Sequence, residues 1–316
     1  MNKLRVVDLF SGMGGLSYGF KLAGFKVIGF DNNKYAVKSF NYNKIGVAYR
    51  MDLSRRLPRY RPDIIIGGPP CRPWSSVNVT RRGKDHPDYS LIEAFFNYIY
   101  RVLRWTNNRK PLIVVLENVP PLKNDSIFLD NAELMVSKGF SYDFKIISYD
   151  QFGVATSRRR LFVIFVNERG IGMKNRNNAS KEIFEILEEM KKKVRPKFVV
   201  RSAIEDLKDK DEGEVPDHVW PRFRTIHKYV ELYKEGKYGW YVLKWDEPAK
   251  SFGNIMKTYI LHPSAWDIIE NGCRPEDLSK VRVISVREAL RIMGFGDDYA
   301  PWGMRGTRYI FPSDVP

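Results

Sequence analysis

The chain has 316 residues, and its 53 Lys and Arg against 37 Asp and Glu give a formal net charge of +16. A surplus of this size is typical of proteins that bind nucleic acid. The apolar fraction of 43% supports a sizeable core, and no apolar run reaches the length of a membrane span, so we expect a globular protein outside the membrane.

The cysteines and histidines of the chain bear on its cellular location and on metal binding. The chain has two cysteines, Cys71 and Cys273, and its start moves straight into a strand pattern, so we expect no signal peptide and a cytoplasmic location. The four histidines are scattered without metal-ligand spacing, and we predict no metal site.

The chain opens with a strand, turn and helix pattern that is typical of nucleotide-binding units. Residues 4–10 form a near-continuous apolar run, residues 11–15 a glycine-rich turn, and residues 16–23 have helical spacing. Glycines let the backbone approach a ligand closely, and the N–H groups of a helix N-terminus can bind it. The dinucleotide pattern GxGxxG fails because Ser17 stands at the third glycine, which disfavours a hydride-transfer enzyme.

Two acidic residues follow the next predicted strands. Asp31 ends a strand predicted over residues 25–30, where a carboxylate can accept hydrogen bonds from ribose hydroxyls. It would equally serve as N-cap of the helix predicted over residues 34–43. Asp52 follows a strand predicted over residues 47–51 and is expected at the same edge of the sheet.

The stretch IIIGGPPCRPWS, residues 64–75, predicts a buried strand that ends in a rigid turn. Because proline restricts its own backbone and that of the preceding residue, Cys71 is held on stiff backbone at the carboxyl end of a strand. Ligands bind at that edge in open α/β sheets. Taken alone, the stretch fits a nucleophile and a buried structural cysteine equally well.

A further apolar run, residues 112–116, predicts a buried strand that delivers Glu117 into a turn stiffened by Pro120. Burial raises the pKa of a carboxyl group, and a raised pKa favours a proton donor. Glu117 is therefore a candidate general acid. Two more strands are predicted over residues 142–148 and 161–166.

Three arginines lead into the last of these strands. Because alternate strand residues face opposite sides, we expect Arg158 and Arg160 on one face and Arg159 on the other. The pattern fits either a basic surface cluster or a pair of guanidinium groups directed into a site.

The sequence changes character after residue 167. KEIFEILEEMKKK predicts an amphipathic helix, and beyond it aromatic residues alternate irregularly with Lys and Arg, which suits contacts to phosphates and bases. Ser285 and Glu288 predict a capping box for a short helix that Gly294 ends. These features indicate a second, smaller module.

Five stretches, in this order, resemble motifs of the DNA (cytosine-5)-methyltransferase family. They are DLFSGMGG at residues 8–15, PPC at 69–71, ENV at 117–119, TSRRR at 156–160 and RVISVREALRIMGFGDDY at 282–299. The resemblance implies a transferase that uses S-adenosyl-L-methionine to methylate DNA at C5 of cytosine.

The same resemblance implies an α/β fold: a doubly wound, Rossmann-like methyltransferase sheet with a smaller, irregular target-recognition domain inserted late. We therefore expect a catalytic and cofactor-binding domain over residues 1–168 and a target-recognition domain over residues 169–280. Residues 281–316 would return to the catalytic domain.

By resemblance, the catalytic residues are Cys71, Glu117, Arg158 and Arg160. Cys71 would add to C6 of the cytosine, Glu117 would hold or protonate N3, and Arg160 with Arg158 would bind the O2 side. The base must leave the duplex for this reaction, so base flipping is expected.

The resemblance also implies a cofactor site. Asp31 would bind the ribose and Asp52 the adenine amino group. The remaining cofactor-binding residues would be Phe10, Ser11, Gly12, Gly14, Leu16, Asn32 and Pro69. The expected partners are double-stranded DNA and a cognate restriction endonuclease of a restriction–modification system, and we expect a monomer associated with the nucleoid.

The chain departs from the family pattern at four places. Arg72 and Thr156 stand where the family usually has Gln, and Asp31 where Glu is common. The last motif, usually Gly-Asn-Ala-Val-Pro, is matched only at Val315 and Pro316.

Two other functions are alternatives. An RNA-acting branch of the family methylates tRNA, but its Cys-Phe-Thr signature is missing, since Cys273 stands in GCRPE. The separate RNA methyltransferases that use two cysteines are disfavoured because Cys273 lacks their Thr-Cys context. An inactive DNA-binding regulatory relative would tend to lose Cys71 or Glu117, and both are present.

Overall fold

A computed structural model describes residues 3–75, 83–172, 179–194, 198–222, 241–253, 260–270 and 280–302. The chain divides into two compact units. The first is built from the described parts of Met1–Ile147 and Arg159–Lys192, the second from those of Ser148–Arg158 and Lys193–Ser313. Cys273 and residues 312–316 lie outside the described residues. None of the helices in the described ranges has the length and apolar character needed to span a bilayer.

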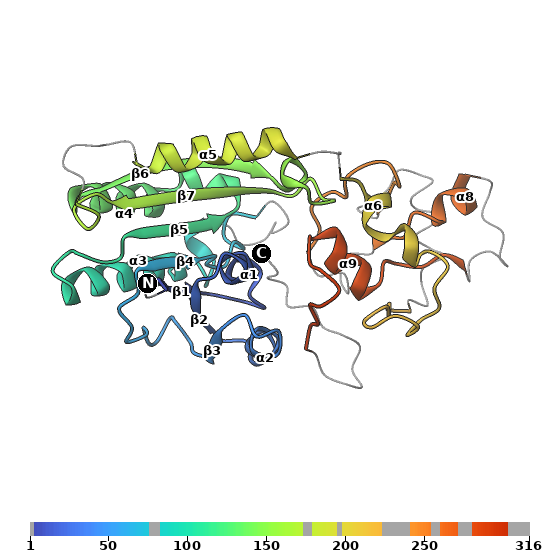
Figure 1. Ribbon diagram of the computed structural model, residues 1–316, viewed down its shortest axis with the longest axis horizontal. Helices are drawn as coiled ribbons and strands as arrows, with labels where there is room; N and C mark the ends of the chain where they lie inside the picture. The colour runs from blue at the N-terminus through green and yellow to red at the C-terminus, as the bar shows by residue number, and fades with distance from the viewer. Residues whose placement is uncertain are drawn as a thin grey trace. The chain divides into compact units, whose positions relative to one another are not determined.

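The first unit is organised around a seven-stranded sheet with the order β3-β2-β1-β4-β5-β7-β6 (Figure 1). The strands are β1 (Arg5–Leu9), β2 (Lys26–Asp31), β3 (Val47–Arg50), β4 (Ile64–Gly67), β5 (Ile113–Asn118), β6 (Phe140–Ser148) and β7 (Arg159–Asn167). The pairs from β3 to β5 are parallel, whereas β7 runs antiparallel to β5. The order reverses between β1 and β4, where a doubly wound sheet binds its ligand.

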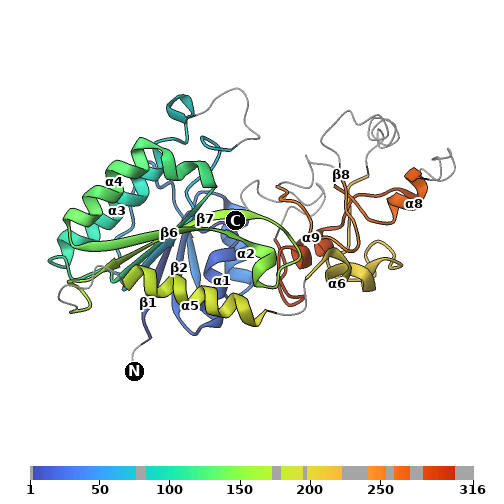
Figure 2. The ribbon, with the colours of Figure 1, turned by 90° about the horizontal axis from the view of Figure 1, so that it is seen from above.

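Helices cover both faces of this sheet (Figures 1 and 2). They are α1 (Gly15–Leu22), α2 (Lys34–Tyr42), α3 (Leu91–Trp105), α4 (Ser126–Ser137) and α5 (Ala179–Lys193). In Figure 2, α3 and α4 lie on one face and α1, α2 and α5 on the other. The prediction of a doubly wound α/β sheet is confirmed.

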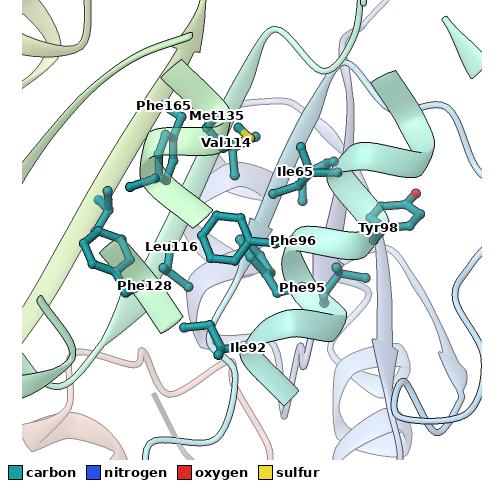
Figure 3. Packing of buried hydrophobic residues seen from close by; sticks show 14 of the residues in the cluster. Ile65, Ile92, Phe95, Phe96, Tyr98, Val114, Leu116, Phe128, Met135 and Phe165 are labelled. Carbon is teal, nitrogen blue, oxygen red and sulfur yellow. The ribbon is translucent and has the colours of Figure 1, made fainter. Parts of the chain in front are cut away.

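The main core lies between the sheet and helices α3 and α4. Alternation along β5 sends Val114 and Leu116 into this core, where they meet Phe95 and Phe96 of α3 (Figure 3). Residues Ile113 and Val115 face the opposite side and pack in the layer beneath α5. Burying both faces explains why the central strands are almost continuously apolar.

The second unit has short elements around helix α9 (Val286–Ile292). Its other elements are α6 (Val200–Ile204), α8 (Ala265–Glu270), and the parallel pair β8 (Tyr241–Val242) and β9 (Ile260–Leu261). The predicted capping box is confirmed: the Ser285 hydroxyl accepts from the Glu288 amide, and the Glu288 carboxylate accepts from the Ser285 amide. Gly294, with φ of 88°, follows the helix end as predicted.

The compact units follow other boundaries than those expected from the resemblance. Helix α5 belongs with the sheet because Phe184 packs against Ile164 and Val166 of β7. Helix α9 belongs with the second unit, although residues 281–316 were expected to return to the first. Helix α4 has no counterpart among the predicted elements.

Candidate active site

The predicted site residues of the first unit gather at one edge of the sheet because most of the strands that carry them are parallel. The carboxyl ends of β1, β2, β4 and β5 share that edge. Since β7 is antiparallel to β5, with Asn118 opposite Leu161, the start of β7 also lies there. The glycine-rich turn, the Cys71 stretch, Glu117 and Arg160 are thereby brought to the same edge of the first unit.

The glycine-rich turn after β1 is shaped by residues in the left-handed backbone region. Phe10, Gly12 and Gly14 have φ of 60°, 52° and 93°. A Cβ on Gly14 would stand 2.5 Å from Ile45 and 2.8 Å from Phe40, so both conformation and space require glycine. The half-buried Leu16 follows in the first turn of α1.

Asp31 is the last residue of β2, and its side chain is hydrogen-bonded to the glycine-rich turn. Its Oδ2 accepts from the Gly12 amide at 2.9 Å, and its Oδ1 accepts from the Asn33 amide at 2.7 Å. The alternative role of Asp31 as helix cap is wrong, because the N-cap of α2 is Asn33, whose side chain accepts from Tyr35 and Ala36. Asp31 is thus placed beside the backbone that a ligand would contact.

Two further predicted cofactor residues lie near the ends of β2 and β3. The Asn32 carbonyl accepts from Arg50 Nε at 3.1 Å. Asp52 is exposed, and its Oδ1 accepts from the amide and hydroxyl of Ser54 at 3.0 and 2.6 Å. These hydrogen bonds lower the pKa of Asp52, so it is an anion at neutral pH.

Asp8 is a buried carboxyl group beneath the glycine-rich turn that the sequence did not single out. Its Oδ2 accepts from the Ser17 hydroxyl at 2.5 Å. Burial raises the pKa of Asp8 to about 8, with a smaller contribution from the charge of Asp31. Within the described part of the chain, neither Asp8 Oδ1 nor the buried Ser11 hydroxyl has a hydrogen-bond partner. Two such atoms beside this turn fit a site that binds a polar ligand.

Glu117 and Arg160 form a buried ion pair at the carboxyl end of β5. Arg160 Nε lies 3.0 Å from Glu117 Oε1, and the two residues are only 9% and 6% exposed. A Cβ on Gly68 would stand 3.1 Å from Glu117 Oε2, so the carboxylate lies directly over the glycine that precedes Pro69. A paired carboxylate at a loop that carries a thiol is suited to acid–base work.

Asn118 ties the loop after β4 to the end of β5. Its Nδ2 donates to the carbonyl of Pro69 at 2.9 Å, and its Oδ1 accepts from the Val119 amide at 2.8 Å. The half-buried Cys71 follows Pro69 by two residues. The loop that carries the thiol is therefore hydrogen-bonded to the end of the strand that carries Glu117.

The arginines around the start of β7 show the expected alternation of burial: Arg158 and Arg160 are buried and Arg159 is exposed. Arg158 belongs to the second unit, where its Nη1 donates to the Phe252 carbonyl at 3.3 Å. Thr156 donates to the Ala249 carbonyl at 2.9 Å in the same unit. Arg158 and Arg160 are thus held by different partners.

Most of the contacts that the sequence did not reveal join distant residues. Asn118 donates to Pro69, 49 positions away, whereas Asp8 accepts from Ser17, nine positions away in the next helix. Trp74 and Asp125, 51 residues apart, are joined by a hydrogen bond, and Arg72 forms an ion pair with Asp88 at 3.1 Å. The signals in the sequence for Asn118 were its place directly after Glu117 and within the ENV stretch of residues 117–119.

Residues 4–309 match the model of a protein family described as C-5 cytosine-specific DNA methylase. The type II methyltransferase M.MthTI of Methanothermobacter thermautotrophicus is 28% identical over 94% of this chain and 88% of its own length. The putative type II methyltransferase M.MJ0563P of Methanocaldococcus jannaschii is 28% identical over 97% of this chain and 93% of its own length.

Solved structures show the same fold. The crystal structure of S. pombe Dnmt2 methyltransferase superimposes with a TM-score of 0.69 at 19% identity, covering 94% of this chain and 88% of its own. The crystal structure of a putative DNA modification methyltransferase encoded within a prophage (E. coli) gives a TM-score of 0.63 at 21% identity. The match covers 94% of this chain and 90% of that one.

Proposed function

The chain belongs to the C-5 cytosine-specific DNA methylase family, and from this premise we propose that it methylates cytosine in a specific duplex DNA sequence through a covalent bond between Cys71 and C6. One observation carries the proposal. The buried Arg160–Glu117 pair, with its 3.0 Å contact, lies at the end of β5 beside the loop that presents Cys71.

Cys71 is the proposed nucleophile. C5 of cytosine is a poor nucleophile, and addition of the Cys71 thiolate to C6 makes C5 electron-rich. After C5 is methylated, loss of its proton to solvent lets the C6–Sγ bond break and returns the thiolate. The stiff Pro-Pro backbone before Cys71 favours a fixed direction of attack.

Glu117 and Arg160 are proposed to stabilise the charge that this addition creates. Negative charge develops on N3 and O2 of the ring. Glu117, which is paired with Arg160, would take up a proton from solvent as the base binds and donate it to N3. Arg160 would face the O2 side, with Arg158 in support. A preorganised charge in a buried site acts more strongly than the same charge in water.

The proposed cofactor is S-adenosyl-L-methionine, which supplies an electrophilic sulfonium methyl group when bound. The residues at the carboxyl ends of β1 to β4 fit it, because Ser11 offers a buried hydroxyl beside the glycine-rich turn. Asp31 would accept from the ribose hydroxyls and Asp52 from the adenine amino group. The cofactor would be lined by Phe10, Ser11, Gly12, Gly14, Leu16, Asn32 and Pro69.

Duplex DNA is the proposed substrate, with the target cytosine flipped out of the helix and the second unit reading the sequence. The net charge of +16 supports binding to the phosphate backbone. Because M.MthTI is named a type II methyltransferase and M.MJ0563P a putative one, we propose that the chain acts as a monomer in a restriction–modification system with a cognate endonuclease. We place this activity in the cytoplasm, at the nucleoid.

The test is transfer of labelled methyl groups from S-adenosyl-L-methionine to duplex DNA, with tRNA as the competing substrate. We expect label in DNA, and bisulfite sequencing of DNA from cells that express the protein should locate it at cytosines of one short sequence. Label in tRNA but not in duplex DNA would contradict the proposal.

A further inference from the structure

Asp125 joins the loop that carries Cys71 to the segment that follows Glu117. Its Oδ2 accepts from Trp74 Nε1 at 2.8 Å, and its Oδ1 accepts from the Tyr89 hydroxyl at 2.6 Å. We propose that Asp125 is a positioning residue for the nucleophile, which it holds in place through the indole of Trp74. This inference rests on the proposed function of Cys71.

The path from Asp125 to Cys71 is short and stiff. The Trp74 amide donates to the Cys71 carbonyl at 3.0 Å, so the two residues form one hydrogen-bonded turn with Pro73 inside it. Trp74 is 8% exposed, and its ring lies 5.6 Å from the ring of Tyr89. A displacement of the indole would therefore displace the turn that presents the thiol.

Asp125 is also connected to Glu117, through the segment that follows β5. After β5 the chain forms the 3-10 helix Pro120–Asn124, and Asp125 then serves as N-cap of α4 by accepting from the Ile127 amide at 3.0 Å. Asn118 holds Pro69 on the other side of Cys71. Hydrogen bonds at Pro69 and at Trp74 thus bracket Cys71, and both come from the segment that follows Glu117.

The charge on Asp125 strengthens these bonds. Burial opposes ionisation of Asp125, but the donors Tyr89, Trp74 and Ile127 outweigh it and lower its pKa. Burial together with the hydrogen bond to Asp125 raises the pKa of Tyr89 to about 12, so the phenol remains a donor at neutral pH. Hydrogen bonds to an ionised acceptor are about twice as strong as neutral ones.

Two substitutions separate the positioning role from the capping role. Asp125→Asn keeps a good N-cap, because asparagine caps as well as aspartate, but turns an N–H₂ group toward the indole N–H. Trp74→Phe keeps an aromatic ring and removes only the donor. The matched control is Tyr100→Phe, which removes the hydroxyl that donates to Asn131 Oδ1 at 3.0 Å between α3 and α4.

Two readouts are measured in a Cys273→Ser background, in which Cys71 is the only thiol. The first is the single-turnover rate of methyl transfer alongside the dissociation constant of S-adenosyl-L-methionine. The second is the rate at which iodoacetamide alkylates Cys71 in the protein alone, which needs neither DNA nor cofactor.

We expect Asp125→Asn and Trp74→Phe to slow methyl transfer by about 10- to 100-fold, since small misplacements of reacting groups have effects of this size. Cofactor affinity should stay within about twofold, and alkylation of Cys71 should become faster because its turn is released. Tyr100→Phe should leave both rates unchanged.

Alkylation and transfer at the parent rates in both variants would overturn the inference, as would losses that only follow the unfolded fraction in thermal melts. If the parent protein transfers no methyl group to DNA, the proposed function fails instead. Alkylation would still decide whether Asp125 holds the Cys71 turn.

Discussion

Each unit contains an arginine paired with a buried glutamate, and the two pairs are built differently. In the second unit, Arg282 directs two nitrogens at Glu288, one to each carboxylate oxygen, both at 2.7 Å. In the first unit, Arg160 directs Nε at Glu117 and donates from Nη1 to the carbonyl of Arg159 at 2.8 Å. The contact between arginine and glutamate is therefore bidentate in the second unit, whereas Arg160 contacts Glu117 through Nε in the first.

The two glutamates also differ in their other contacts. Glu288 also accepts from the Ser285 amide at 2.7 Å and lies 3.5 Å from His262 Nε2. Burial opposes its ionisation, but the hydrogen bonds and charge of Arg282 prevail and lower its pKa. Burial lowers the pKa of His262 to about 3, so this ring is neutral. Glu117 instead lies over the bare backbone of Gly68, at the sheet edge where ligands bind.

Glu117 and Glu288 are both buried, so burial of a carboxylate does not by itself mark a functional group. Both carboxylate oxygens of Glu288 accept hydrogen bonds, which suits a structural role at the start of α9. Glu117 stands where the glycine-rich turn and the Cys71 loop meet the sheet edge. Matched substitutions in the two pairs should therefore separate activity from stability.

The largest expected effect is on activity and comes from Glu117→Gln. The amide oxygen can still face Arg160, whose Nη1 keeps its bond to the Arg159 carbonyl, so the free energy of unfolding should change by only about 1 kcal/mol. Loss of the ionisable group should slow methyl transfer by about 10²- to 10⁴-fold. Single-turnover kinetics and urea unfolding of one preparation measure both quantities. Wild-type turnover in this variant would remove Glu117 from the mechanism.

Glu288→Gln should have the converse effect. An amide N–H₂ group must face a donor of Arg282 or Ser285, so we expect destabilisation of about 3 kcal/mol in urea unfolding. At temperatures where the variant remains folded, its methyl-transfer rate should stay close to that of the wild type. Glu205→Gln is the control, since Glu205 pairs with Arg201 on the surface and should change little. An undisturbed unfolding transition in Glu288→Gln would refute the structural role.

The effect expected from Asp8→Asn depends on pH. The folded chain keeps a proton on Asp8 up to about pH 8, whereas an unfolded aspartate loses it near pH 3.8. Wild-type stability should therefore fall as pH rises from 5 to 8, and Asp8→Asn should gain about 1 kcal/mol per pH unit relative to it. Urea unfolding at pH 5, 6.5 and 8 measures this difference.

Asp63 provides the opposite case. Burial opposes its ionisation, but the hydrogen bonds and charges of Lys110 and Arg5 together outweigh burial and lower the pKa of Asp63. Its contribution is present above the unfolded pKa and is lost only in acid, so Asp63→Asn should differ from the wild type by a constant amount between pH 5 and 8. A constant difference for Asp8→Asn as well would show that Asp8 is ionised in the fold.

Local signals account for what the sequence predicted. The apolar runs around Val7, Ile65 and Val114 mark strands covered on both faces, and the Gly-rich and Pro-rich turns mark their ends. Parallel strands then place the residues after them on one edge, so the grouping of the glycine-rich turn, the Cys71 stretch and Glu117 followed from order alone. The capping box of α9 was equally local.

Other features depend on contacts between distant residues. Helix α4 escaped prediction because its four buried residues leave Leu129, Leu134 and Val136 exposed, so its apolar stripe is weak. The bonds from Asn118 to Pro69 and from Trp74 to Asp125 join positions about 50 residues apart, and no spacing rule connects them. The division into units also required tertiary packing, since Phe184 carries α5 onto the sheet.

The most direct test of the central claim is to locate the bond between protein and base. A duplex that carries the mapped site with 5-fluorocytosine at the target cannot lose a C5 proton, so the adduct should persist after methyl transfer. Peptide mass spectrometry of the digested complex should find the nucleotide on Cys71, and Cys71→Ser should abolish both adduct and turnover while cofactor still binds. Methylation of the ordinary duplex with no adduct on Cys71, or with turnover retained in Cys71→Ser, would contradict the account.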